Sequence, residues 1–327
     1  MVMEWLNFWS RKSRGVFGFT SMATAEEVTC DIDASHLTVL ITGASSGIGF
    51  ETARVLAKRG AHIVMAVRNM DAGAVVKDLI LAECPKAEID LLMLDLSSLE
   101  SVHAFCSSFI SLNLPLNVLI NNAGIMGGPF TLTKDGLESQ FVTNYLGHFL
   151  LTKLLLPSMI ATAEKSGIEG RIINVSSDAH WFAPLGGFRF ENLNLEKRYI
   201  PYINYAKSKL ALILHSNELA RRLKEDGAHV TVNSVNPGII VTKILRNYHR
   251  LAVIAPLVEN ILSWIVLKTI PQGAATQCFL AIHPAVCGVS GKYFQNCTFS
   301  KRSDLASSAT LSRKLWEFSD SLLQKNA

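Results

Sequence analysis

Three tyrosines and two lysines stand close together in the stretch RYIPYINYAKSKL, residues 198–210. A phenol has an ordinary pKa of about 10, so it needs help to exchange a proton at neutral pH. Of the three phenols, only Tyr205 is followed four residues later by a lysine, Lys209, which in a helix lies one turn away on the same face. Its ammonium group would stabilise a phenolate. The spacing makes this pair a candidate for acid–base chemistry, and a packed aromatic stripe with solvated lysines is the alternative.

A glycine-rich turn, TGASSGIG, occupies residues 42–49 and precedes a segment with helical periodicity. Gly43 permits a sharp turn, Gly47 lets the backbone approach a pyrophosphate, and Gly49 allows the helix to pack closely. The free N–H groups at the start of such a helix face phosphates. The turn therefore predicts a dinucleotide site. The other contacts expected from it are Ser45, Ser46 and Ile48.

The residue that follows the apolar segment 61–67 indicates which of the two nicotinamide dinucleotides, NAD(H) or NADP(H), would bind. An acidic side chain there would accept hydrogen bonds from the adenosine ribose and repel a 2′-phosphate. This chain has Arg68 instead and no acid before Asp71. An arginine can hold a 2′-phosphate and stack on adenine. We therefore predict NADP(H), with a solvated surface arginine as the alternative interpretation.

Helices and strands must position these residues. Along the chain, short apolar segments alternate with longer segments of regular periodicity. Segments that are apolar on both faces are typical of strands in a covered parallel sheet. Six are predicted, at residues 37–42, 61–67, 88–94, 116–121, 170–176 and 229–235. The segments between them, among them 49–60 and 136–159, have helical periodicity. The pattern predicts an α/β fold with one doubly wound parallel sheet and helices on both faces.

Further contacts with a nucleotide are expected where the third and fourth strands end. Asp95, with Leu96 beside it, could accept from the adenine amino group, and capping a helix is the competing role. In Asn122-Ala123-Gly124 the small residues let the backbone pass beside the nucleotide, while an asparagine can tie neighbouring strands together.

A strongly apolar segment at about residues 240–270 precedes the last helix–strand unit. We expect one or two helices there, lying over the carboxyl ends of the strands, where ligands bind in such sheets. A lid of this kind favours a hydrophobic substrate, and a helix that only seals the core is the alternative. No second domain is indicated, so we predict a catalytic domain over residues 36–327 after an extension over residues 1–35.

The extension places Trp5, Phe8 and Trp9 beside a basic cluster at residues 11–14, a composition typical of a membrane interface. Its apolar run is too short to span a bilayer or to serve as a secretory signal. Peripheral membrane contact, a targeting segment and an extension packed on the domain remain open. The cellular location is likewise open between the cytoplasm and the chloroplast, where the envelope is the expected site.

The composition excludes several classes of protein. Of the 327 residues, 49% are hydrophobic, which suits a filled core and excludes a disordered chain. The net charge of 31 − 27 = +4 is too small to predict a nucleic-acid partner. The six cysteines form no CxxC pair and are expected to be free thiols. The nine histidines show no metal-ligand spacing, so no metal is predicted, and His148, His180 and His215 are expected in the core or at a pocket rim.

The chain resembles the short-chain dehydrogenase/reductase family over roughly residues 36–295. The resemblance rests on motifs that occur in the family's order: TGASSGIG, NNAG, a serine ending the fifth strand, YAKSK and NPGIIVT. The resemblance implies a Rossmann-type fold in which Tyr205 is the acid/base and Lys209 also bonds the nicotinamide ribose. It implies that Ser177 bonds the substrate oxygen and that Asn144 holds a water in a proton relay to Lys209. The nicotinamide contacts that it implies are Pro237, Gly238, Ile240 and Thr242.

Ser176 stands beside Ser177, and strand alternation points only one of them into the site. The family pattern selects Ser177. The insertion between Ser177 and Tyr205, which contains FENLN, resembles the retinol-dehydrogenase-like branch of the family. Three further segments resemble the plant short-chain dehydrogenases of the chloroplast inner-envelope translocon type: MATAEEVTCDID, IPQGAAT and KLWEFS.

Two functions follow from the resemblance. The first is an NADP(H)-dependent oxidoreductase that acts on a hydrophobic alcohol, ketone or aldehyde of terpenoid, steroid-like or retinoid-like character, as a monomer or a homodimer. The second is an NADPH-sensing, calmodulin-binding component of chloroplast protein import. For the second, residues 311–325 could form an amphipathic target helix, and a terminal helix packed on the domain is the alternative.

Overall fold

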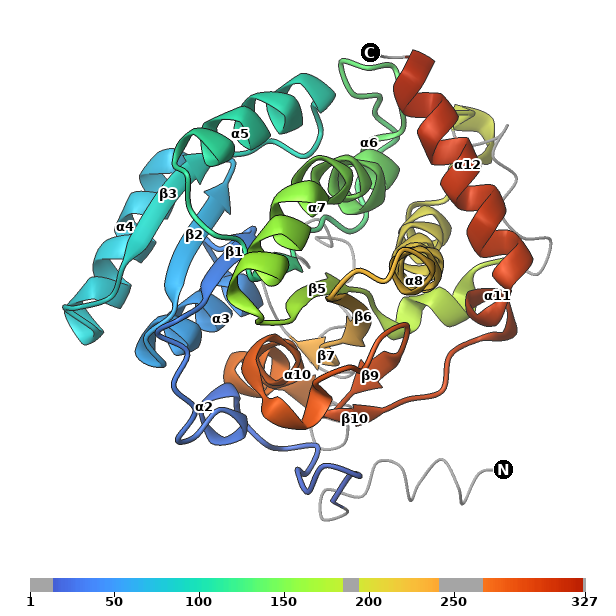
Figure 1. Ribbon diagram of the computed structural model, residues 1–327. Helices are drawn as coiled ribbons and strands as arrows, with labels where there is room; N and C mark the ends of the chain where they lie inside the picture. The colour runs from blue at the N-terminus through green and yellow to red at the C-terminus, as the bar shows by residue number, and fades with distance from the viewer. Residues whose placement is uncertain (1–13, 185–193, 241–266, 326–327) are drawn as a thin grey trace, which may run out of the picture.

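The computed structural model describes residues 14–184, 194–240 and 267–325, and its main sheet has eight strands (Figure 1). All six predicted strands are present. They are β1 (Thr38–Thr42), β2 (His62–Val67), β3 (Ile89–Met93), β4 (Val118–Asn121), β5 (Gly170–Val175) and β6 (Val230–Asn236). These six are parallel, whereas β9 (Tyr293–Gln295) and β10 (Thr298–Phe299) add a parallel strand and then an antiparallel one. The predicted α/β fold is confirmed.

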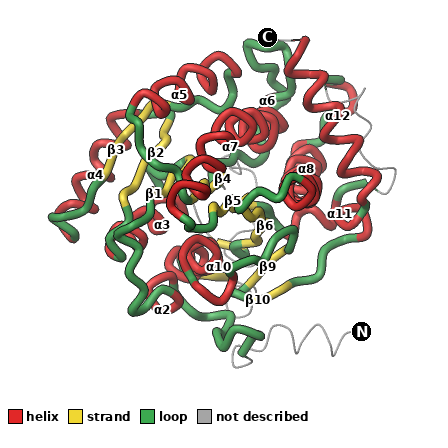
Figure 2. The backbone as a smooth tube through the Cα atoms, in the orientation of Figure 1, coloured by secondary structure: helices red, strands yellow, loops and turns green. Residues whose placement is uncertain are grey.

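The strand order is β10-β9-β6-β5-β4-β1-β2-β3, so the direction in which the sheet grows reverses between β1 and β4. Helices cover both faces (Figure 2). One face carries α3 (Gly47–Lys58), α4 (Met70–Glu83) and α10 (Ile270–Ile282), and the other carries α5 (Leu99–Ser111), α7 (Gly147–Ser166) and α8 (Pro201–Glu225). In sheets of this kind, ligands bind in the crevice at the carboxyl ends of the strands, where the order reverses.

The predicted helix at residues 136–159 is built from three pieces. A short helix, α6 (Ser139–Phe141), leads through the π-helical turn η1 (Val142–Leu146) into α7. By length and composition, Ser139–Ser166 could cross a membrane. Its aromatic side chains, among them Tyr145 and Phe149, instead lie buried in the core beside the sheet. A buried core helix has the same composition as a membrane span, which accounts for the apolar sequence.

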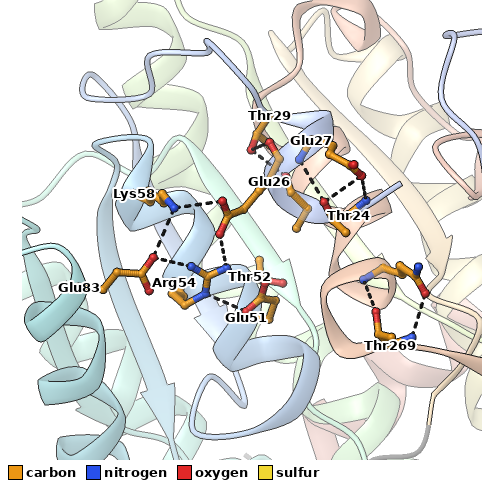
Figure 3. Close-up of polar contacts among 12 residues, drawn as sticks. Thr24, Glu26, Glu27, Thr29, Glu51, Thr52, Arg54, Lys58, Glu83 and Thr269 are labelled. Carbon is orange, nitrogen blue, oxygen red and sulfur yellow. Dashed lines mark hydrogen bonds and ion pairs between the residues drawn. The ribbon is translucent and has the colours of Figure 1, made fainter. Parts of the chain in front are cut away.

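Residues 14–35 pack on the domain. This agrees with one of the three interpretations of the N-terminal extension, the packed extension. The ring of Phe17 lies 5.3 Å from that of Phe279 in α10. The short helix α2 (Ala25–Val28) buries Ala25 and Val28 against the same core. Figure 3 shows Glu26 of α2 bonded to Arg54 and Lys58 of α3. The aromatic cluster at Trp5, Phe8 and Trp9 lies outside the described residues.

The C-terminal segment also belongs to the core. Helix α12 (Ala309–Lys325) follows α11 (Asp304–Ser307) and lies against α8 (Figure 1). Leu315 is fully buried, and the Tyr145 hydroxyl lies 2.8 Å from that of Ser319. The Arg222 guanidinium stacks 4.5 Å from the Trp316 ring. The apolar face of α12 is therefore covered by the domain itself, as the packed-helix alternative expected.

The predicted lid lies largely outside the described residues. Only its ends are described, where β7 (Ile239–Ile240) pairs in parallel with β8 (Leu267–Lys268). The prediction of helices between these two strands therefore stays a prediction.

Candidate active site

The glycine-rich turn connects β1 to α3 at the reversal point of the sheet. Gly43 has φ +68°, a left-handed conformation that side chains rarely adopt. A Cβ at Gly49 would stand 2.4 Å from the Gly43 carbonyl oxygen, so only glycine allows this approach. Ser46, the N-cap of α3, makes no capping bond with its side chain. Unlike the starts of α4 and α5, which Asn69 and Ser98 cap, the first turn of α3 keeps N–H groups available for phosphates.

A cavity of about 460 Å³ opens beside this turn. Its volume is within the range of small-molecule and cofactor sites. Most of the predicted nucleotide contacts line it, together with the candidate acid–base pair. These residues are Gly43, Ser45, Ser46, Gly47, Ile48, Gly49, Arg68, Asp95, Leu96, Asn122, Ala123, Gly124, Tyr205, Lys209 and Pro237.

Four other predicted residues are described but do not line the cavity. Ser177 lies beside Tyr205, and Asn144 lies behind the loop that contains Gly124. Gly238, with φ +89°, contacts the side chain of Lys268, and Ile240 packs on the first turn of α10. Thr242 lies outside the described residues.

Arg68 lines the cavity, is exposed and forms no ion pair with any other described residue. Its guanidinium is therefore available to an anionic ligand. Asp95 uses one carboxylate oxygen within its own turn, where it accepts from the Ser97 N–H at 2.9 Å and the Ser97 hydroxyl at 2.7 Å. The cap of α5 is Ser98 and not Asp95.

Asparagine side chains tie the central strands together, as the sequence suggested. The Asn122 amide donates to the Thr42 carbonyl at 2.9 Å, linking the end of β4 to β1. Asn121 similarly donates to Asn174 of β5 at 2.8 Å. These bonds hold the strand ends that form the floor of the cavity.

His148 has a structural role that sequence reasoning did not assign to it. Its Nδ1 lies 3.0 Å from the Asn144 carbonyl, so that nitrogen carries the proton, and Nε2 accepts from the Thr42 hydroxyl at 2.9 Å. The Thr42 oxygen accepts in turn from the N–H groups of Asn122 and Ala123, each at 2.9 Å. Burial lowers the pKa of His148 to about 4, so the ring is neutral. The chain of bonds joins α7 to the strand ends of the cavity.

Tyr205 and Lys209 lie on the inner face of α8, 8% and 3% exposed. The Lys209 ammonium lies 5.6 Å from the centre of the Tyr205 ring and donates to the Val175 carbonyl at 2.8 Å. Ser177 lies beside Tyr205 and acts to lower the pKa of its phenol. Ser176 also lines the cavity, but its hydroxyl is engaged, donating to the Lys209 carbonyl at 2.7 Å. The structure therefore brings Ser177, Tyr205 and Lys209 together, and the last two line the cavity.

Burial changes the pKa values of Tyr205 and Lys209. It raises the pKa of Tyr205 to about 12, while the hydrogen bond from Ser177 acts in the opposite direction. Burial also lowers the pKa of Lys209 to about 8. At neutral pH the phenol is protonated and most of Lys209 is charged. The arrangement can donate a proton to an oxygen placed beside Ser177 and Tyr205.

Asn144 lies in the π-helical turn, and its side-chain amide is already engaged. It donates to the Ile125 carbonyl and the Ser208 hydroxyl, each at 2.9 Å, and accepts from the Ile125 N–H at 2.8 Å. A Cβ at Gly124 would stand 3.4 Å from both Asn144 Oδ1 and Lys209 Nζ. The asparagine thus fixes the loop that passes Lys209, and its water-holding role stays a prediction.

Lys268 is a half-buried cation that the sequence did not single out. Its aliphatic chain crosses Gly238, with Cδ 2.9 Å from the place of a Cβ there. Burial lowers its pKa to about 8. Lys268 is on a two-residue strand behind a long apolar segment, so no local pattern marked it. Within the described parts of the chain, no three His, Cys, Asp or Glu side chains gather into a group that could hold a metal ion.

The chain is similar to known dehydrogenases. A family model described as short chain dehydrogenase matches residues 37–188. The sequence is 50% identical to the short-chain dehydrogenase TIC 32 B, chloroplastic, of Brassica napus, covering 94% of this chain and 95% of that one. It is 43% identical to human retinol dehydrogenase 14, covering 86% and 85%.

Two solved structures have the same fold. An uncharacterised protein from Mycobacterium paratuberculosis superposes with a TM-score of 0.70 at 32% identity, covering 91% of this chain and 97% of that one. An NAD(P)-dependent gluconate 5-dehydrogenase from Beutenbergia cavernae with bound NADP has a TM-score of 0.63 at 25% identity, covering 80% and 95%.

Proposed function

The chain belongs to the short-chain dehydrogenase/reductase family, and we propose that it is an NADP(H)-dependent oxidoreductase that interconverts a hydrophobic alcohol and its ketone or aldehyde. The observation that carries the proposal is the convergence of Ser177, Tyr205 and Lys209 beside the cavity of the glycine-rich turn. Family membership and the likeness to the retinol dehydrogenase and TIC 32 relatives, both expected from the sequence, are confirmed.

The residues at the cavity fit an NADP(H) molecule. The uncapped first turn of α3 would hold the pyrophosphate, and Arg68, which has no ion-pair partner in the described chain, would hold the 2′-phosphate. Lys209, Asn122 and Pro237 would surround the nicotinamide end. When bound, the cofactor supplies or accepts the hydride. The NADP in the gluconate 5-dehydrogenase structure supports this choice.

The protein's own residues would control the proton and the position of the substrate oxygen. Ser177 would donate its hydroxyl hydrogen bond to that oxygen, and Tyr205 would give it the phenolic proton in reduction and take it back in oxidation. The charge of Lys209 would stabilise the phenolate that remains. Because burial keeps Tyr205 protonated at neutral pH, its phenol holds the proton that reduction of a carbonyl requires.

Apolar residues beside the catalytic ones support a hydrophobic substrate. Trp181 and Phe182, a few residues after Ser177, are 51% and 74% exposed, and Ile200 and Tyr202, just before Tyr205, are 55% and 50% exposed. Where such side chains form a contiguous surface, they are typical of sites that bind apolar partners. They support a terpenoid, steroid-like or retinoid-like alcohol, ketone or aldehyde. The chloroplastic relatives support a location in the chloroplast.

A regulatory role in chloroplast import is the second candidate, and the 50% identity to the TIC 32 proteins favours it. Against it stands the position of α12. The calmodulin-target interpretation needs a free apolar face, but Leu315 is fully buried and Trp316 packs on Phe149 and His215. Calmodulin would have to unfold this packing before binding.

A Tyr205→Phe variant separates the two functions. The enzyme hypothesis predicts that turnover of hydrophobic ketones and aldehydes falls about a thousandfold, because the proton donor is lost while the ring remains. NADPH affinity, measured by fluorescence titration, should stay within about twofold. If the wild-type protein oxidises no NADPH across a broad carbonyl panel, yet binds calmodulin in an NADPH-dependent way, the regulatory function replaces the enzymatic one.

A further inference from the structure

His180, three residues after Ser177, connects the catalytic serine to the C-terminal segment. It lies in the helical turn η2 (Asp178–Phe182) and is 1% exposed. Its Nδ1 lies 2.8 Å from the Ser177 carbonyl oxygen, and its Nε2 lies 3.2 Å from the Ser303 backbone nitrogen. From its place in the sequence we expected a core or pocket-rim position. The ring lies in the core, directed toward Ser303 at the start of α11.

The two partners determine the protonation of the ring. A carbonyl only accepts, so Nδ1 carries the hydrogen, and a backbone N–H only donates, so Nε2 must present its lone pair. Only the neutral Nδ1–H tautomer makes both bonds. Burial lowers the pKa of His180 and favours that form, with the charge of Arg302 acting in the same direction and that of Asp178 against it.

These bonds act on the backbone of the residue whose hydroxyl meets Tyr205. The Ser177 carbonyl accepts from both the His180 ring and the His180 N–H, the latter at 3.2 Å. The Ser177 hydroxyl accepts from the Ala179 N–H at 3.1 Å, so it lies at the start of the turn that His180 holds. A shift of this turn would move the hydroxyl relative to Tyr205.

The other end of the connection is equally well anchored. Ser303 caps α11, its hydroxyl accepting from the Ala306 N–H at 3.3 Å, and the α11 segment packs on α8, the helix that carries Tyr205. A second anchor holds the same turn from the sheet side, where the Asp178 carboxylate accepts from Tyr293 at 3.3 Å and from Gln295 at 3.2 Å. The turn after Ser177 is thus held between the sheet and the C-terminal segment.

We propose that His180 is a positioning residue for Ser177 and that the C-terminal segment, from Ser303 onward, helps to build the active site through it. The inference rests on the proposed function, because that function makes the Ser177 hydroxyl the partner of the substrate oxygen. Displacing an oriented group by about 1 Å can cost a hundredfold in rate.

The first test compares three variants of one side chain. His180→Asn keeps a donor at the place of Nδ1, His180→Gln keeps an acceptor at the place of Nε2, and His180→Leu keeps neither. We expect kcat to fall roughly ten- to a hundredfold in the Leu variant and by a smaller factor of about five in the Asn and Gln variants, because each of these keeps one of the two bonds. The NADPH dissociation constant, measured without substrate, should change less than about twofold in all three.

The pH–rate profile supplies a readout that loss of folding would not move. The Ser177 hydrogen bond lowers the pKa of Tyr205, whose other charged or titratable neighbours are Lys209 and Tyr293. Displacing Ser177 should therefore shift the Tyr205 limb of the profile to higher pH, by more in the Leu variant than in the Asn variant, which still bonds the Ser177 carbonyl. Equal profiles and equal kcat in wild type and His180→Leu would overturn the proposal.

The second test removes the Ser303 N–H. Ser303 has φ −62°, which proline adopts without strain, so Ser303→Pro deletes the donor to His180. Ser303→Ala deletes the same hydroxyl cap but keeps the N–H, which makes it the matched control. We expect kcat to be at least about fivefold lower in the Pro variant than in the Ala variant, with similar NADPH binding.

Equal kcat in these two variants would refute the part of the proposal that concerns the C-terminal segment. Tyr205→Phe, assayed alongside, distinguishes this failure from failure of the proposed function. If Tyr205→Phe is inactive and the His180 variants behave as wild type, only the positioning role is wrong. If Tyr205→Phe retains full turnover, the proposed function itself is wrong.

Discussion

The hydroxyl of Ser176 donates a 2.7 Å hydrogen bond to the main-chain carbonyl of Lys209, and this bond distinguishes the two adjacent serines at the end of β5. Ser176 is 2% exposed and its hydroxyl faces the backbone of α8, whereas Ser177 lies beside the Tyr205 side chain of the same helix. One serine joins strand to helix, and the other is placed for chemistry.

Replacing each serine by alanine should therefore give two different defects. Ser177→Ala is expected to lower kcat about a hundredfold and to raise the pKa of Tyr205 in the pH–rate profile, because it removes the hydroxyl at the phenol. Ser176→Ala removes a buried hydrogen bond and should lower the free energy of unfolding by about 1 kcal/mol. Steady-state kinetics and urea unfolding of both variants check this. A larger loss of kcat in Ser176→Ala would show that the assignment of the two serines is reversed.

Arg68 should control the choice of cofactor. Removing a charged partner of the 2′-phosphate typically costs about 2 kcal/mol, which corresponds to roughly thirtyfold in affinity. Arg68→Ala is therefore expected to raise the KM for NADPH by that order while changing the KM for NADH less than about threefold. Arg198→Ala, at another exposed arginine, is the control for loss of surface charge. Equal increases for both cofactors would remove the basis for NADP(H) specificity.

His215 should make the protein sensitive to acid. Its ring is 4% exposed among Tyr145, Phe149 and Trp316, and neither ring nitrogen has a partner among the described residues. Burial lowers its pKa to about 3. As pH falls below about 6.5, the unfolded chain therefore binds a proton at this position that the folded chain does not, and stability is lost.

His215→Phe removes that difference and should stabilise the protein at acid pH. Between pH 6 and 4, the free energy of unfolding should fall less steeply in the variant, by about 1.4 kcal/mol per pH unit. Urea unfolding over this range measures the slope. His103→Gln, at an exposed histidine, should leave the slope as in wild type. An unchanged slope in His215→Phe would mean that the buried ring does not resist protonation.

The N-terminal segment that the structure describes should contribute to stability. Phe17 packs 5.3 Å from both Phe279 and Phe299, measured between ring centres. Phe17→Ala is expected to lower the free energy of unfolding by roughly 2 kcal/mol, less than for a fully buried ring. Val16→Ala is the matched control, because Val16 is 77% exposed and its loss should be nearly neutral. Equal effects of the two variants would mean that this segment does not pack on α10 in solution.

Much of the architecture could be predicted from the sequence because it depends on local patterns. Each of the first six strands is an apolar segment such as residues 37–42, whose neighbours switch to helical periodicity, and all six are present at nearly the expected bounds. The prediction was less accurate for the helix at residues 136–159. There the π-helical turn at Val142–Leu146 interrupts the regular helix, and no residue pattern announced it.

The sequence by itself determined the pairing of Tyr205 with Lys209 and the glycine-rich turn, because both depend on residues within one helical turn or one loop. Only the tertiary structure decided which serine lies beside the Tyr205 phenol. It also decided that His148 and His180 form hydrogen bonds that fix the backbone around the site. The contact of His180 with Ser303 joins residues 123 positions apart, and that of Thr42 with His148 joins residues 106 apart. Such bonds exist only after the sheet has brought its strand ends and the C-terminal segment together, so no local pattern in the chain encodes them.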